Sequence, residues 1–181
     1  MVKNIKRFRK DMEKESNPIA ERDETGNLIY LDIVPMTYIF PGDYTIFIEE
    51  FKKNPNTTWI MKPTAGAQGL GIFLVTKLKQ IQDHSKKPYV ISRYIEKPLL
   101  VGKKKFDLRI YVLVTSYKPL KVWLSSQGFA RFCTENYSSD IGEMDNMMIH
   151  LTNNAIQKKQ NDFNTSHGSK WSIENLRFYL E

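Results

Sequence analysis

A regular alternation of side chains between residues 106 and 115 constrains the fold of this chain more than any other feature. Apolar side chains occupy every second position, at Phe106, Leu108, Ile110, Val112 and Val114. Asp107, Arg109 and Tyr111 fall between them, on the opposite side. A period of two is that of a β-strand, whereas a helix repeats every 3.6 residues. The segment is therefore predicted to be a strand, and residues 122–124 and 129–134 are predicted to continue its sheet.

Shorter strands and several helices are predicted around this segment. The other strands are expected at Thr58–Lys62, Gly71–Val75 and Tyr89–Arg93. Helices are expected at Met1–Glu15, Asp43–Lys53, Leu78–Asp83 and Ser172–Glu181, and a polar loop at Ser138–Met147. Asp43 is predicted to cap the second helix, whose apolar residues share one face. The mixture predicts a fold of the α+β class.

Composition limits the class of protein. The 181 residues amount to one domain or parts of two, and 41% hydrophobic residues are enough for a packed core. Lys and Arg exceed Asp and Glu by 27 − 20 = 7, which favours acidic partners. The single cysteine, Cys133, excludes an internal disulfide and a four-thiolate zinc site, so a reducing compartment such as the cytosol is expected. No apolar run approaches the ~18 residues of a membrane span.

Three glycines within six positions, Gly66, Gly69 and Gly71, follow a predicted strand that contains Lys62. Their backbone N–H groups can approach an anion closely. In a P-loop or a dinucleotide-binding fold such glycines open a helix, but here a strand is predicted next. A flap between two strands, covering a nucleotide whose phosphates Lys62 reaches, agrees with this order. A simple hairpin turn is the alternative that these residues alone leave open.

Protein kinases also use a glycine flap, but their phosphate-binding lysine follows it and a His-Arg-Asp loop comes later. Here Lys62 precedes the glycines, and the segment His150–Asn153 reads His-Leu-Thr-Asn. The triplet Asp-Phe-Asn at residues 162–164 lacks the glycine of the kinase metal-binding triplet. The order and the missing residues therefore disfavour a kinase.

Charged residues on the later strands form a second set of candidates. Lys105, Asp107 and Arg109 alternate, so they share one face of the sheet, an arrangement suited to ATP phosphates and an anionic substrate. A solvated edge strand is the alternative. Arg131 lies among apolar residues on a predicted inner strand, where a cation needs a partner, either a substrate carboxylate or a structural aspartate. Taken alone, His150 is more typical of a structural histidine than of a catalytic base.

Five segments in order resemble the tubulin–tyrosine-ligase-like family, whose members carry an ATP-grasp fold. They are Trp59–Ile72 (Met-Lys-Pro, then Gln-Gly-x-Gly-Ile), Tyr89–Pro98, Lys105–Arg109, Gly128–Arg131 and His150–Asn153. Residues 90–95, 150–158 and 167–171 look closest to the polyglutamylases of this family. The resemblance implies a basic helix and linker at residues 1–30, a central ATP-grasp subdomain with the glycine flap at 31–98, and the start of the C-terminal subdomain at 99–181.

The resemblance also implies roles for individual residues. ATP would be bound by Lys62, Gln68, Gly69, Ser92, Arg93, Tyr94, Ile95, Lys105, Phe106, Asp107, Thr152 and Asn153. Catalytic roles would fall to Lys105, Arg109 and Arg131. The substrate glutamate would be held by Gln68, Arg131 and Lys170. No residue of the chain is expected to bind the metal, because the family's ligands are expected beyond its end.

The implied reaction is the addition of glutamate to glutamate side chains of tubulin tails, with ATP and Mg²⁺, through an acyl phosphate. Such chemistry depends on positioning and charge neutralisation more than on a serine or cysteine nucleophile. The implied partners are tubulin or microtubules, through their acidic tails, free glutamate and other subunits of a polyglutamylase complex. Neither nucleic acid nor a membrane is expected as a partner. The implied location is the cytoplasmic cytoskeleton, including the axoneme or basal body of a cilium.

Two departures from the family pattern keep other interpretations open. Leu70 stands where many relatives carry a lysine in the flap. The chain also ends 181 − 153 = 28 residues after Asn153, before the family's metal-binding segment is expected, so it is predicted to be an enzyme core lacking both ends. One alternative is a non-catalytic module that binds tubulin or scaffolds a complex. Another is a ligase that adds glycine or tyrosine.

Overall fold

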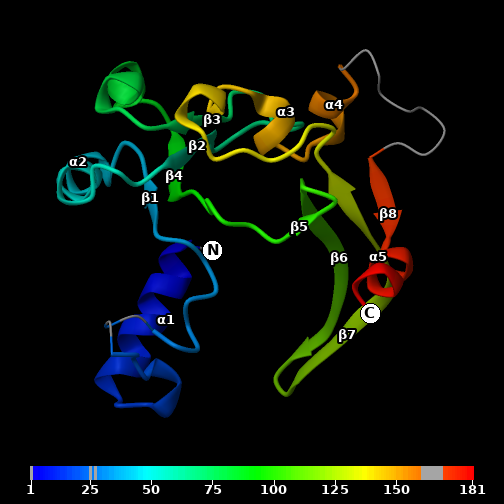
Figure 1. Ribbon diagram of the computed structural model, residues 1–181. Coiled ribbons are helices and arrows are strands. Elements are labelled where there is room, and N and C mark those ends of the chain that lie inside the picture. Colours follow the sequence, from blue (N-terminus) through cyan, green and yellow to red (C-terminus); the bar gives the residue numbers. More distant parts are fainter. Residues whose placement is uncertain (1, 25, 27, 160–168) are drawn as a thin grey trace. The chain divides into compact units, whose positions relative to one another are not determined.

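The computed structural model describes residues 2–24, 26, 28–159 and 169–181 (Figure 1). Its contacts divide into two compact units. The first comprises Met1–Ala65 and Leu74–Ile95, and the second comprises Gly66–Phe73 and Glu96–Glu181. Each unit combines helices with an antiparallel sheet, so the predicted α+β class is confirmed. No helix among the described residues is both long and apolar enough to cross a membrane.

The first unit contains a sheet in the order β1-β4-β2-β3, in which β4 pairs antiparallel with both β1 and β2. Its elements are α1 (Val2–Lys14), β1 (Thr37–Ile39), α2 (Tyr44–Lys53), β2 (Trp59–Pro63), β3 (Phe73–Val75) and β4 (Tyr89–Arg93), with 3₁₀ turns at Pro18–Ala20 and Leu78–His84. The predicted helix at residues 78–83 is therefore a 3₁₀ helix. The other predicted elements of this unit are confirmed to within two residues.

Aromatic side chains of α2 form much of the core of the first unit. Phe47 and Phe51 are buried on the apolar face predicted for this helix, and the Phe47 ring lies 5.0 Å from Trp59 in an edge-to-face arrangement. Asp43 occupies the N-cap position, but its side chain does not cap the helix. Instead its carboxylate accepts a hydrogen bond from the backbone N–H of Ile39. The predicted capping bond is therefore wrong, because the preceding turn brings a different donor to Asp43.

The second unit contains a sheet in the order β5-β6-β7-β8, with every neighbouring pair antiparallel. Its elements are β5 (Leu100–Val101), β6 (Lys104–Tyr117), β7 (Leu120–Phe132), α3 (Met147–His150), α4 (Asn154–Gln157), β8 (Lys170–Ser172) and α5 (Ile173–Leu180), with a 3₁₀ turn at Ile141–Glu143. The core comprises Val101, Ala130, Phe132 and Leu176, with Phe106 packed against them. Leu176 comes from α5, so this helix packs on the face of the sheet that carries the core.

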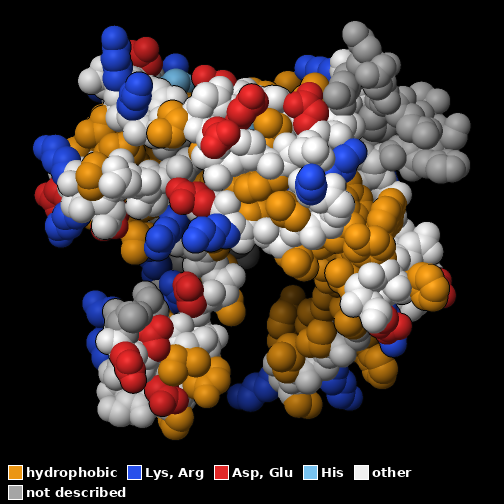
Figure 2. Space-filling model, in the orientation of Figure 1, with side chains coloured by type: hydrophobic (Ala, Val, Ile, Leu, Met, Phe, Trp, Pro, Cys, Tyr) orange, Lys and Arg blue, Asp and Glu red, His pale blue; other side chains and the backbone are white. Residues whose placement is uncertain are grey.

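β6 and β7 form the long ribbon visible in Figure 1. The two predicted pieces at residues 122–124 and 129–134 are one strand, β7, which pairs with β6 from Phe106–Phe132 to Tyr117–Leu120. The predicted strand at 106–115 is confirmed and extends at both ends. Most of its apolar side is exposed, however, with Ile110 at 49% and Val112 at 55%. Figure 2 accordingly shows hydrophobic side chains gathered over the ribbon.

Candidate functional site

One face of the β6–β7–β8 sheet carries five of the residues predicted for the site. Asp107 on β6 lies directly opposite Arg131 on β7, and Arg131 lies opposite Lys170 on β8. Directly opposite residues point to the same face. Lys105 and Arg109 lie two positions on either side of Asp107, so they share that face. We call these five residues the cationic face, because it combines four cations with one carboxylate.

Arg131 and Asp107 form the central ion pair of the cationic face. The Arg131 Nε donates to Asp107 Oδ1 over 2.9 Å, and Nη2 contacts the second carboxylate oxygen, Oδ2. This hydrogen bonding raises the pKa of Arg131 against the opposing effect of its partial burial. Of the two partners that the sequence left open for Arg131, the structure shows the aspartate. A guanidinium has five N–H donors. The fork of two nitrogens that contact Asp107 fixes the orientation of the guanidinium plane.

The other cations of this face are positioned by different contacts. Lys105 Nζ donates to the backbone carbonyl of His150 over 3.0 Å, which joins the sheet to the segment 150–153. Lys170 Nζ lies 4.9 Å from the centre of the Phe129 ring. Arg109 is exposed, and its guanidinium lies 5.8 Å from the ring of Tyr111. An anion approaching this face would therefore meet cations whose stems already rest on the sheet.

The segment 150–153 is fixed by buried polar contacts. His150 is buried, and its Nε2 hydrogen-bonds with the backbone carbonyl of Glu143 at 3.0 Å. Burial lowers the pKa of His150, so the imidazole is neutral at pH 7. This environment is that of the structural histidine that the sequence favours. Thr152 is buried, whereas Asn153 is half-buried and occupies the N-cap position of α4.

Gln157, which the sequence analysis did not select, holds the same segment from the other side. Its fully buried side chain accepts hydrogen bonds from the Thr134 N–H (2.8 Å) and hydroxyl (2.6 Å). Its amide group donates to the carbonyls of Met148 (3.2 Å) and Leu151 (2.5 Å). Gln157 thus ties the segment after β7 to the loop that carries Thr152 and Asn153. No local pattern distinguishes this glutamine from an exposed one at a helix end.

The glycine flap packs against this loop. Gly69 has φ +84°, and a Cβ there would lie 2.6 Å from Ile156 Cδ1 and 3.2 Å from Asn153 Oδ1. Only glycine therefore allows this approach. The neighbouring Gln68 has φ +62°, a conformation uncommon for a residue with a side chain. The structure thereby brings Gly69 of the flap together with Asn153, whereas their predicted role in ATP binding stays a prediction.

The remaining predicted ATP residues lie in the first unit or in a core. Lys62 is on β2; the residue as a whole is exposed, but desolvation of its ammonium lowers its pKa. Ser92 bonds with the Thr37 hydroxyl at 2.9 Å, and Ile95 is 58% exposed. The backbone N–H groups of Arg93 and Tyr94 donate to the carbonyls of Met36 and Thr58. An adenine bound beside this segment would therefore need other backbone groups.

Phe106 differs from the other predicted ATP residues on β6. Its ring stacks on Phe132 at 5.3 Å and belongs to the core of the second unit. Lys105 and Asp107, its neighbours in sequence, point to the opposite face of the strand. The side chain of Phe106 therefore packs against the core, on the face of β6 opposite the cationic face.

The described residues favour neither a reactive thiol nor a metal cluster. Burial raises the pKa of the Cys133 thiol to about 11, so it is not a thiolate at neutral pH. In residues 2–24, 26, 28–159 and 169–181, no three His, Cys, Asp or Glu side chains are close enough to hold a metal ion together. These residues therefore do not fit a carboxylate-rich Mg²⁺ site. His167 and Gly168, part of the motif at 167–171, lie outside the described residues.

The cationic face, the flap and the loop belong to an α+β unit whose antiparallel sheet carries four cations and whose glycine-rich backbone packs against a polar loop. Comparison with known proteins identifies the family of this chain. The family model described as "Tubulin-tyrosine ligase family" matches residues 1–181. The chain belongs to this family, which confirms the resemblance seen in the sequence.

Several relatives are named as tubulin polyglutamylases. The "Probable alpha-tubulin polyglutamylase Ttll1" of Tetrahymena thermophila is 54% identical, over 100% of this chain and 47% of its own length. The "Probable tubulin polyglutamylase ttll-9" of Caenorhabditis elegans is 45% identical over 99% and 43%. Human "Tubulin polyglutamylase TTLL5" is 37% identical over 90% and 13%. The chain thus spans just under half the length of the first two relatives.

Proposed function

We propose that this chain supplies the ATP-binding and carboxylate-binding part of a ligase that adds glutamate to glutamate side chains of tubulin tails. The proposed scaffold is an ATP-grasp fold, with residues 31–98 as its central subdomain, residues 99–181 as the start of the C-terminal subdomain, and residues 1–30 as a helix and linker. The observation that carries the proposal is the cationic face. The names of the relatives, which describe tubulin polyglutamylases, support the substrate.

The reaction brings several anions together. An acceptor carboxylate oxygen attacks the γ-phosphorus of ATP, the bond to the bridging oxygen breaks, and ADP leaves. The amine of free glutamate then attacks the acyl carbon of the acyl phosphate. Phosphate departs with the bonding electrons, the amine loses a proton, and an isopeptide bond remains. Each step places triphosphate, acyl phosphate or carboxylate groups close to one another, and fixed cations reduce that repulsion.

Residues on the sheet, the flap and the loop have different proposed roles in this reaction. Lys105, Arg109, Arg131 and Lys170 supply the cations, and the fork to Asp107 holds the Arg131 guanidinium in one plane. Gln68 and Gly69 cover the phosphates from the flap, with Thr152 and Asn153 on the loop against which Gly69 packs. In the first unit, Lys62 and the segment Ser92–Ile95 are likewise assigned to ATP binding. Mg²⁺, when bound, would neutralise phosphate charge.

Transfer of labelled glutamate to microtubules, with ATP and the purified protein, tests this proposal. We expect Arg131→Ala to lower the rate by about 10²-fold, because one oriented donor to a developing anion has an effect of that size. Lys121→Ala is the matched control, since it removes one exposed cation far along β7 from the cationic face. Equal rates for wild type and Arg131→Ala would refute the assignment. Labelled glycine and tyrosine in place of glutamate test the donor amino acid.

A second candidate function is a non-catalytic module that binds tubulin or scaffolds a polyglutamylase complex. It is favoured by the lack of a metal-holding cluster among the described residues. This function predicts salt-sensitive microtubule binding without ATP turnover. Tubulin-stimulated release of phosphate from ATP by the purified protein would exclude it. Either function places the protein on the cytoskeleton, including cilia or basal bodies, which a fluorescent fusion would test.

A further inference from the structure

The N-terminal helix α1 carries a large share of the protein's positive charge and little of its packing. Its 13 residues hold six Lys or Arg and two acidic residues, a net charge of 6 − 2 = +4, against +7 for the whole chain. No residue of α1 is buried. The helix is nevertheless strongly amphipathic, with Val2 and Ile5 half-buried on one side. Such a helix presents cations and apolar surface together.

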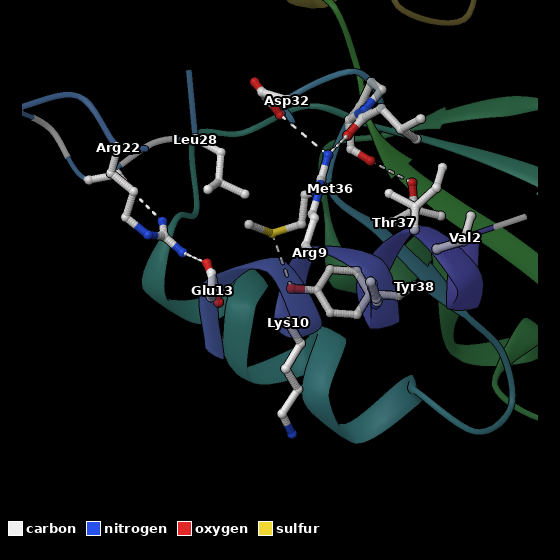
Figure 3. Close-up of a pocket in the computed structure, with 15 residues that line it drawn as sticks. Val2, Arg9, Lys10, Glu13, Arg22, Leu28, Asp32, Met36, Thr37 and Tyr38 are labelled. Carbon is white, nitrogen blue, oxygen red and sulfur yellow. Dashed lines mark hydrogen bonds and ion pairs between the residues drawn. The ribbon is translucent and has the colours of Figure 1, made fainter. Parts of the chain in front are cut away.

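A cavity of about 590 Å³ lies between α1 and the segment 28–38 of the same unit (Figure 3). This volume falls in the range of pockets that hold ligands in proteins. Its apolar lining includes Val2, Ile5, Leu28, Met36 and the ring of Tyr38. Burial, with smaller effects of Glu50 and Asp43, raises the pKa of Tyr38 to about 12. The phenol therefore stays neutral and does not repel an anion.

Two cations that line the cavity are engaged with the protein. Arg22 contacts the carboxylate of Glu13, and Arg9 reaches from α1 toward the segment that contains Asp32 (Figure 3). The Arg9 Nη2 contacts the backbone carbonyls of Leu31 and Val34, so this side chain fastens the helix. The Nε of Arg9 is buried without a hydrogen-bond partner.

Two other cations that line the cavity are exposed. Lys6 and Lys10, one turn apart on α1, form none of the ion pairs found among the described residues. Lys6 Nζ lies 5.1 Å from the centre of the Tyr38 ring. With four cations and two carboxylates, the lining has a net charge of +2. It therefore attracts an acidic ligand.

We propose that this cavity binds an acidic peptide, with its carboxylates on Lys6 and Lys10 and its aliphatic stems on the apolar lining. The inference rests on the proposed function in one respect: the peptide would be the glutamate-rich tail that the ligase modifies. Glu13 and Asp32 disfavour a phosphate backbone, because they would lie against closely spaced negative charges. A glutamate-rich peptide spaces its charges on flexible stems and avoids these carboxylates.

The test measures binding without catalysis. A fluorescein-labelled glutamate-rich peptide is titrated with the full chain at low salt, in the absence of ATP, and fluorescence anisotropy gives the Kd. We expect K6E/K10E to weaken binding about tenfold or more, since each reversal removes an attraction and adds a repulsion. K118E/K121E, at the turn between β6 and β7, is the matched control with the same change of net charge and should keep the wild-type Kd. The neutral variant K6Q/K10Q is expected to fall between them.

Each outcome decides the proposal. Equal weakening by both charge reversals would show attraction by net charge alone and would overturn it. Tighter binding of a single-stranded oligonucleotide than of the peptide would assign the cavity to nucleic acid instead. Self-association that K6E/K10E abolishes, without peptide binding, would assign the surface to a second copy. K6E/K10E should bind ATP as the wild type does, so a failure of the ATP and ligase assays and a failure of this site are distinguishable.

Discussion

The two ends of the β6–β7 ribbon both carry apolar residues on paired strands but have different surroundings. At the base, Ala130 and Phe132 are 0% and 7% exposed, because β8 adds a third strand and α5 covers the face that carries them. Toward the tip, Leu113 and Leu124 are 62% and 71% exposed. Only the base carries the cationic face. The comparison shows that alternation makes a strand, whereas a neighbouring element decides whether the strand supports a site.

Truncation of one apolar side chain at each end tests this difference most directly. Phe132→Ala at the base is expected to lower the free energy of unfolding by about 3–5 kcal/mol, because it opens a cavity among packed aromatic side chains. Leu124→Ala toward the tip is expected to change it by about 0.5 kcal/mol, since that side chain buries little surface. Urea denaturation measures both values. Similar losses for the two variants would show that the tip is covered in solution.

Removal of the buried amide next to the base is the next largest expected effect. Gln157→Leu would leave the Thr134 N–H and two backbone carbonyls without partners, at a cost of about 2–4 kcal/mol. Gln157→Glu keeps the accepting oxygen but loses both donated bonds, and Gln82→Leu, at an exposed position, is the matched control. Thermal unfolding ranks the three. Under the proposed function, Gln157→Glu should also raise the KM for ATP, and an unchanged KM would separate this side chain from the site.

A single methyl group at the base tests how tightly its strands pack. A Cβ on Gly128 would lie 2.8 Å from the backbone oxygen of Arg109 and 2.9 Å from Ile173 Cγ1. Because neither backbone nor helix can move freely, we expect Gly128→Ala to cost about 1–3 kcal/mol. Gly142→Ala, whose added Cβ would meet nothing within 4 Å, is the control and should be near neutral. Denaturation midpoints of equal value would contradict the close approach.

The base region also contacts a histidine, His150, whereas the described residues at the tip include no histidine. Burial, with a smaller effect of Lys105, lowers the pKa of His150 below its ordinary value of 6.5, despite the opposing hydrogen bond to Glu143. The unfolded chain therefore binds the proton more readily, so the free energy of unfolding should fall as the pH decreases below about 6.5. Stability curves between pH 7.5 and 5.5 measure the slope. His150→Gln should flatten this slope. An equal flattening by His84→Gln would show that the pH dependence does not belong to His150 specifically.

Most of the secondary structure, the family and part of the candidate site could be predicted from the sequence. The strand at 106–115, the short strands and most helices follow from local periodicity, which the backbone obeys wherever the chain lies. The family follows from five ordered motifs. Lys105, Asp107 and Arg109 share a face because they alternate, and that relation needs only a strand.

Relations across strands and between distant segments came from the tertiary structure alone. Register decides that Arg131 meets Asp107 and Lys170, and a shift of one residue would have turned it to the opposite face. Gln157 and Gly69 acquire their roles from groups that are distant in sequence, as does the cavity beside α1. The sequence by itself therefore determined the strands and the chemistry on them, since both depend on neighbours along the chain. The partners of those side chains, and which apolar residues are covered, were decided only when the strands paired.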